Sequence, residues 1–142
     1  MSDLPPLVRD QRKVDADHLQ LLAIFHFIGA GLAVVGMLFL FAHYSFMHHF
    51  LDNPKMWEGQ RGQPPPAQFF AIFKWFYVFF GLWLVVSLVL NLLSGFFLQA
   101  KKHRTFSLIV AGVNCIHIPL GTVLGVFTII VLLRSSVREL YD

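Results

Sequence analysis

The longest apolar run of the chain is the feature that most constrains its fold. From Thr105 to Leu133, 29 residues follow one another without a formally charged side chain. As a helix rising about 1.5 Å per residue, this run is longer than a hydrocarbon layer of about 30 Å requires. A helix without a polar face must lie in lipid or be surrounded by protein. A chain of 142 residues is too short to surround it, so the run predicts a membrane-embedded helix.

Two further apolar runs, Leu19 to Ala42 and Phe69 to Leu98, support the same interpretation. The chain is 56% hydrophobic and only 13% charged, whereas soluble domains are about a quarter charged. We therefore expect an all-α integral membrane protein with three long transmembrane helices at about residues 18–50, 67–98 and 105–134. Residues 1–17 are expected to form a polar cytoplasmic tail, and residues 18–142 a single transmembrane domain.

The first helix is expected to begin near His18. Asp15 or Asp17 could accept hydrogen bonds from the free N–H groups of its first turn, where negative charge also suits the helix dipole.

Pro119 and Gly121 interrupt the third run and leave two architectures open. In the preferred one, a single long helix bends at Pro119, because proline removes a backbone hydrogen bond and crowds the preceding turn. In the alternative, the chain turns at Pro119–Gly121, so that the bundle has four helices and the last two form a short hairpin. Each arm of that hairpin would reach only about 21 Å, less than a full crossing.

The basic residues indicate an orientation. Lys and Arg occur in short clusters at the ends of the apolar runs, which is a topology signal and argues against nucleic-acid binding. The N-terminal tail and the turn Gln99–Arg104 together hold six of the eleven Lys and Arg residues. We therefore expect a multi-pass protein with a cytoplasmic N-terminus. A hairpin would add Arg134 and Arg138 to that side.

Polar side chains within the apolar runs are the candidate site. His26 and Asn91 lie roughly 10 Å from the cytoplasmic ends of their helices, and Asn114 about 13 Å. The common depth predicts a hydrogen-bonded cluster that holds the helices together. The parts of the predicted helices that would lie in the hydrocarbon layer contain no Asp, Glu, Lys or Arg, because Lys74 is placed at the rim. The absence of such residues argues against a proton pump or coupled transporter.

Two metal-binding alternatives remain open. His26 and His117 could be axial ligands of haem b, although their estimated depths differ by about 8 Å. His43, His48 and His49 lie near the outer rim and, together with Met47 and Met56, could suit copper. No cofactor is expected in the preferred interpretation.

Small residues mark two faces where helices can approach closely. Gly29, Ala33 and Gly36 recur at three- and four-residue steps in the first helix. Gly121 and Gly125 form a G-x-x-x-G step in the third run. The sequence has no catalytic triad, P-loop, HExxH motif or paired carboxylates, so we expect no enzymatic activity.

Two stretches, HLQLLAIFHFIGAG (His18 to Gly31) and AGVNCIHIPLGTVLGVFTIIVLLRSSVRELY (Ala111 to Tyr141), resemble a family of small bacterial multi-pass membrane proteins without a characterised function. The most specific part of the resemblance is PLGTVLGVFT. It implies a location in the bacterial inner membrane, and no catalytic or binding residues.

Taken together, these features favour a non-catalytic accessory or assembly subunit of a larger membrane complex. Its partners would be membrane lipids and other membrane subunits, or further copies of itself. The alternatives from other classes are a haem- or metal-binding electron carrier that uses intramembrane histidines and a small oligomeric channel.

Overall fold

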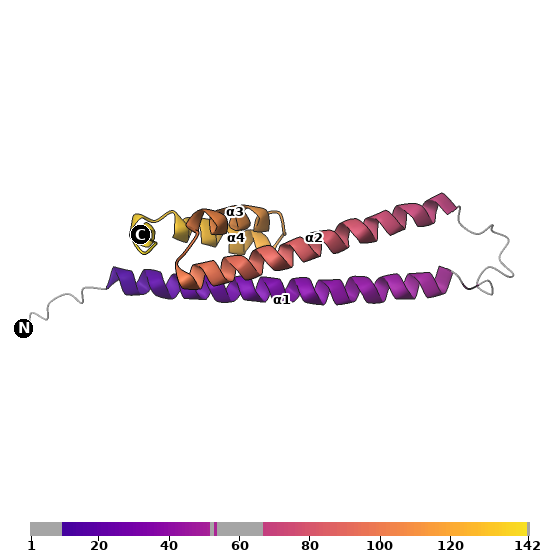
Figure 1. Ribbon diagram of the computed structural model, residues 1–142, viewed down its shortest axis with the longest axis horizontal. Helices are drawn as coiled ribbons and strands as arrows, with labels where there is room; N and C mark the ends of the chain where they lie inside the picture. The colour runs from indigo at the N-terminus through magenta and orange to yellow at the C-terminus, as the bar shows by residue number, and fades with distance from the viewer. Residues whose placement is uncertain (1–9, 52, 54–66, 142) are drawn as a thin grey trace, which may run out of the picture. The chain divides into compact units, whose positions relative to one another are not determined.

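The computed structural model describes residues 10–51, 53 and 67–141, and all regular secondary structure in these residues is helical. The expected all-α fold is confirmed. The helices are α1 (Gln11–Leu51), α2 (Ala67–Ala100), α3 (Arg104–Asn114), α4 (Leu120–Leu132) and α5 (Ser135–Arg138) (Figure 1). The loop between α1 and α2, including Met56, lies outside the described residues except for Asn53.

Among the described residues, two helices are long and apolar enough to cross a membrane. The qualifying segments are Gln11–Phe50 in α1 and Ala71–Ala100 in α2. A third apolar helix, α4, has only 13 residues and therefore extends about 20 Å, which is less than the thickness of a hydrocarbon layer.

Helix α1 begins at Gln11, earlier than the predicted start near His18. Its N-cap is Asp10, whose Oδ1 accepts hydrogen bonds from the backbone N–H groups of Arg12 (3.1 Å) and Lys13 (3.4 Å). The capping role predicted for Asp15 or Asp17 is therefore wrong, because an earlier aspartate satisfies the first turn.

The chain divides into two compact units. Within the described residues, unit 1 comprises residues 10–29 and 90–141, which include the start of α1, the end of α2 and all of α3 to α5. Unit 2 comprises the rest of α1 and the beginning of α2.

In unit 1, α1 and α2 run antiparallel and contact each other closely. The ring of Phe27 lies so near Gly95 that a Cβ there would be 2.7 Å from a ring carbon, and the same ring meets Phe96 edge to face at 5.1 Å. The apolar core draws on α1, α2, α4 and α5: Leu19, Leu22, Ala23, Leu98, Val131, Leu132 and Val137.

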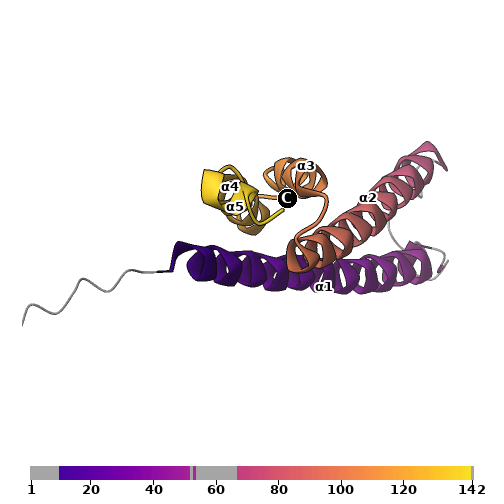
Figure 2. The same ribbon diagram turned by 60° about the vertical axis from the view of Figure 1, so that its left-hand side comes forward.

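The preferred architecture, one long helix bent at Pro119, is wrong, because α3 and α4 are separate helices that form an antiparallel hairpin (Figures 1 and 2). At the open end, Arg104 Nε donates to the carbonyl oxygen of Leu132 at 2.8 Å. Nearer the turn, the absent side chain of Gly125 lets the α4 backbone contact the carbonyl oxygen of Ala111.

The turn of the hairpin lies slightly earlier than the alternative predicted, since Cys115–Pro119 connect the helices and Gly121 already belongs to α4. Proline has no N–H and cannot extend the hydrogen-bond ladder of α3. Carbonyl groups freed at the turn find partners within it: Thr122 donates its hydroxyl to the oxygen of Cys115 at 2.8 Å, and the N–H of His117 bonds the oxygen of Asn114 at 2.9 Å.

In unit 2, α1 and α2 meet along small residues. A Cβ at Gly36 would lie 3.2 Å from a methyl carbon of Leu84, and one at Gly81 would lie 3.7 Å from Leu40. Most large apolar side chains of this unit point outward, as Trp75 does with 73% of its surface exposed.

Candidate functional site

Four side chains from four helices form a buried polar cluster in unit 1, hereafter the polar cluster. Its members are His26 in α1, Asn91 in α2, Asn114 in α3 and Thr128 in α4. None is more than 4% exposed. The structure thus brings together the three residues that the sequence placed at one depth and adds a fourth.

Asn91 is the centre of this cluster. Its side-chain amide donates to Asn114 Oδ1 at 3.2 Å, and the amide of Asn114 donates back to Asn91 Oδ1 at 2.9 Å. The same oxygen of Asn91 lies 2.9 Å from His26 Nδ1, which donates to it when that ring nitrogen carries the proton. Asn91 therefore connects α1 to α3.

Thr128 connects α4 to the same group. Its hydroxyl donates to the carbonyl oxygen of Leu124 at 2.7 Å and lies 3.3 Å from His26 Nε2. Both ring nitrogens of His26 therefore have a polar neighbour from another helix. Since unsatisfied polar groups are costly in an apolar interior, the four side chains stabilise one particular packing of four helices.

The cluster lacks the parts of a catalytic site. It has two carboxamides, a hydroxyl and an imidazole, and both ring nitrogens of the imidazole lie in hydrogen-bond contact with protein atoms rather than facing an open cavity. A general acid or base must instead reach a substrate directly or through one water molecule. What the arrangement can do is join helices.

The residues proposed for haem do not fit that group in this arrangement. An axial ligand needs one ring nitrogen directed at the iron, whereas Asn91 and Thr128 occupy both nitrogens of His26. His117 lies in the turn between α3 and α4, whereas His26 lies in α1.

The rim histidines belong to unit 2 and do not converge on one point. His43 Nδ1 lies 2.6 Å from the hydroxyl of Tyr77, and the ring of His48 packs edge to face on Tyr44. His49 is exposed. Within the described part of the chain, no three His, Cys, Asp or Glu side chains form a group that could hold a metal ion.

The small residues lie where helices meet. Gly29 faces Asn91, whose Oδ1 would lie 3.4 Å from a Cβ at that position, and Ala33 is buried. Gly121 and Gly125 face α3 within the hairpin, because a Cβ at Gly121 would contact Asn114 and His117.

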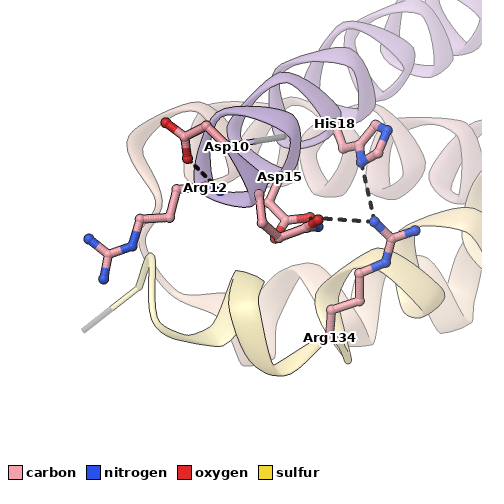
Figure 3. Close-up of polar contacts among 6 residues, drawn as sticks. Asp10, Arg12, Asp15, His18 and Arg134 are labelled. Atoms are coloured by element: carbon pink, nitrogen blue, oxygen red, sulfur yellow. Dashed lines mark hydrogen bonds and ion pairs between the residues drawn. The ribbon is translucent and has the colours of Figure 1, made fainter. Parts of the chain in front are cut away.

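A second polar group, which sequence reasoning missed, lies where α1 begins and α4 ends (Figure 3). Arg134 Nη1 lies 3.4 Å from Asp15 Oδ1 and 3.3 Å from His18 Nδ1. Gln11 Nε2 also donates to Asp15 Oδ1, at 3.1 Å. The Asp15 side chain is fully buried, so the group ties the end of α4 to the first turns of α1.

The positions of Asp15 and Thr128 along their helices could have predicted that both side chains are buried. Asp15 precedes Leu19, Ala23 and His26 at steps of four, four and three, so it shares their buried face. Thr128 follows Gly121 and Gly125 at steps of four and three and shares the face that packs on α3.

Comparison of the chain with protein-family models, with curated proteins and with solved structures found no match.

Proposed function

We propose that this chain is an integral membrane protein in which α1 and α2 cross the bilayer and the α3–α4 hairpin enters it from one side. The observation that carries this proposal is the distribution of polarity. Large apolar side chains such as Phe39 (70% exposed) and Trp75 point outward, while the polar cluster is buried and bonded to itself. Water would disfavour so large an apolar surface, whereas lipid accepts it.

The α3–α4 hairpin is suited to enter the bilayer from one side without crossing it. Its tip exposes Ile116, Ile118 and Leu120, with Ile118 83% exposed, and its open end carries Arg104 and Arg134. Apolar groups at one end and cations at the other suit a segment whose tip lies in hydrocarbon and whose base lies among headgroups.

The basic residues support a cytoplasmic position for the end of unit 1 at which α1 begins and α4 ends. All of its described Lys and Arg residues lie where α1 starts, where α2 is followed by α3, or at and just after the end of α4: Arg12, Lys13, Lys101, Lys102, Arg104, Arg134 and Arg138. The contacts of Arg134 with Asp15 and of Arg104 with Leu132 hold these segments at one end of the unit. The positive-inside rule assigns such an end to the cytoplasm.

Within that membrane, we propose that the protein is a non-catalytic accessory or assembly subunit of a bacterial inner-membrane complex. Its polar side chains serve internal packing, as the polar cluster illustrates. Two outward glycines, Gly31 in α1 and Gly112 in α3, have no atom within 4 Å of where a Cβ would stand. Such positions allow the backbone of a partner helix to approach closely.

Two measurements test this proposal. Alkaline carbonate should leave the chain in the membrane fraction. Extraction in mild detergent, followed by mass spectrometry, should then recover stoichiometric partner subunits. Gly31→Leu should reduce their recovery, because a large side chain blocks close approach, while Val34→Leu serves as a matched control on the same helix.

Two results would count against it. A chain released by carbonate is not integral to the membrane. A chain that purifies as a stable monomer with no partner is not an accessory subunit. An absorption spectrum of the purified protein tests the haem alternative separately, and we expect no Soret band because His26 is engaged by Asn91 and Thr128.

A further inference from the structure

A cavity at the polar end of unit 1 has side chains of both charges in its wall. It measures about 360 Å³ and lies between the first turns of α1 and the end of α2. Helix α1 contributes Asp17 and Gln20, the end of α2 contributes Gln99, and Lys101 follows directly after α2. This volume lies within the range of small-molecule sites.

The two charges in this wall do not neutralise each other directly. Asp17 and Lys101, both in the described part of the chain, form no ion pair with one another although they line the same cavity. A ligand that carries both signs could therefore contact each of them from within the cavity. Two carboxamides, Gln20 and Gln99, add hydrogen-bond donors and acceptors to the same wall.

Local backbone structure positions Lys101. Its N–H bonds the oxygen of Leu98, and the N–H of Lys102 bonds the oxygen of Phe97 at 2.9 Å. With Lys101 in the left-handed region (φ 51°), these bonds form the Schellman motif that ends α2. Lys101 is half-buried as a result, while Lys102 is exposed and does not line the cavity.

The surface next to the cavity is apolar on both helices. One and two turns beyond Gln20, α1 exposes Ile24 and Ile28. About one and two turns before Gln99, α2 exposes Phe96 and Leu92. Polar groups at the helix ends followed by exposed apolar side chains match, in depth, the headgroup and chains of a phospholipid.

We propose that this cavity binds the headgroup of a phosphatidylethanolamine lipid. Lys101 holds the phosphate, Asp17 accepts hydrogen bonds from the ammonium, and the acyl chains lie along the exposed apolar residues of α1 and α2. A headgroup with a free ammonium fits better than choline, which has no N–H to donate to Asp17. It also fits better than an anionic headgroup, which would face the carboxylate of Asp17. The inference rests on the proposed membrane location.

The test is native mass spectrometry of the full chain, delipidated in detergent and supplied with dioleoylphosphatidylethanolamine, its N-methyl and N,N-dimethyl forms, and dioleoylphosphatidylcholine. In a separate sample, dioleoylphosphatidylglycerol is supplied as the anionic lipid. We expect retention to fall along this series as N–H donors are removed, by roughly fivefold from first to last, the most that an exposed ion pair usually contributes. This series uses the unmodified chain, so the result does not depend on whether a variant folds.

Variants then test the separate roles of Asp17 and Lys101 in binding the headgroup. Asp17→Asn should abolish the discrimination between the ethanolamine and choline lipids. Lys101→Gln should weaken retention of every phospholipid, whereas Lys102→Gln, a change of the same kind beside the cavity, should leave retention unchanged. Circular dichroism of each variant checks that the helices persist.

Three results would overturn the inference: equal retention of the ethanolamine and choline lipids by the unmodified chain, an unchanged preference in Asp17→Asn, or tightest retention of dioleoylphosphatidylglycerol. Carbonate extraction separates this failure from failure of the proposed function. A chain that resists carbonate but shows no headgroup preference keeps its membrane role and loses only the lipid site.

Discussion

At the scale of the residue, Asn91 makes more hydrogen bonds than any other member of the polar cluster. It bonds Asn114 twice and His26 once. Replacing it leaves the polar atoms of two buried side chains without their partners, and an orphaned buried group costs more than a hydrogen bond contributes.

We expect Asn91→Leu to lower the free energy of unfolding by about 2 kcal/mol, since it removes three hydrogen bonds of about 0.6 kcal/mol each. Denaturation by SDS in mixed micelles measures the change. Ser94→Ala is the matched control on the same helix, because the hydroxyl of Ser94 is buried without a hydrogen-bond partner among the described residues. The double variant Asn91→Leu, Asn114→Leu should recover part of the loss. Equal stability of Asn91→Leu and the unmodified chain would show that the cluster is not structural.

Tyr141 lies after the last helix and packs against the core of unit 1. Burial raises the pKa of its phenol to about 12, while the positive charge of Arg104 acts in the opposite direction. The folded state therefore holds the proton more tightly than the unfolded state. This contribution to stability is fully present below pH 10 and is lost as the pH rises from about 10 to about 12.

Absorbance near 295 nm follows the ionisation directly. The difference between the unmodified chain and Tyr141→Phe should show a phenol that titrates near pH 12, and the unmodified chain should lose more stability than the variant between pH 10 and 12. Tyr141→Phe should be neutral or slightly stabilising at pH 7, because its buried hydroxyl has no hydrogen-bond partner among the described residues. A difference titration centred near pH 10 would contradict the burial of Tyr141.

At the scale of the element, the α3–α4 hairpin depends on glycine where the two helices touch. A Cβ at Gly125 would contact the backbone of Ala111 and lie 2.6 Å from Cys115 Sγ. The carbonyl oxygen of Ala111 belongs to the α3 backbone, so it cannot move away without separating the helices. The G-x-x-x-G step thus serves packing within one hairpin.

We expect Gly125→Ala to lower the free energy of unfolding by about 1–3 kcal/mol, the usual cost of overpacking. Gly112→Ala in α3 is the matched control, because a Cβ there meets open space and alanine favours helix by up to about 1 kcal/mol. Thermal unfolding followed by circular dichroism distinguishes the two. Similar melting temperatures for both variants would show that the hairpin is not closely packed at Gly125.

At the scale of the whole molecule, the contact of Arg134 with Asp15 places the end of α4 beside the start of α1 within unit 1. If α1 and α2 cross the membrane and the hairpin does not, both of these ends face the same compartment. The topology of the chain can therefore be tested from residues just after α4.

A cysteine at the exposed position Ser135, introduced into a Cys115→Ala background, should be protected from an impermeant thiol reagent added from the periplasmic side. It should react in inverted membrane vesicles. A cysteine at Asn53, after α1, should show the opposite pattern. Labelling of Ser135→Cys from the periplasm would mean that α3 and α4 follow each other across the membrane as one span. The proposed topology would then be wrong.

The sequence by itself determined that the chain is helical and that its long helices are apolar, because length and hydropathy are local properties. It also placed His26, Asn91 and Asn114 at one depth, since rise per residue converts position in a helix into height. Spacing alone could not show the hydrogen bonds between them, which depend on which faces meet.

Only the tertiary structure decided between a bend and a hairpin at Pro119. A proline interrupts the ladder of hydrogen bonds in either case, and the outcome depends on whether the following helix finds a surface to pack on. Gly121 and Gly125 provide that surface by admitting the backbone of α3, and Arg104 and Arg134 hold the open end. The roles of Asp15 and Thr128 arise in the same way, because a polar residue on an apolar helix face acquires its partner only when the faces come together.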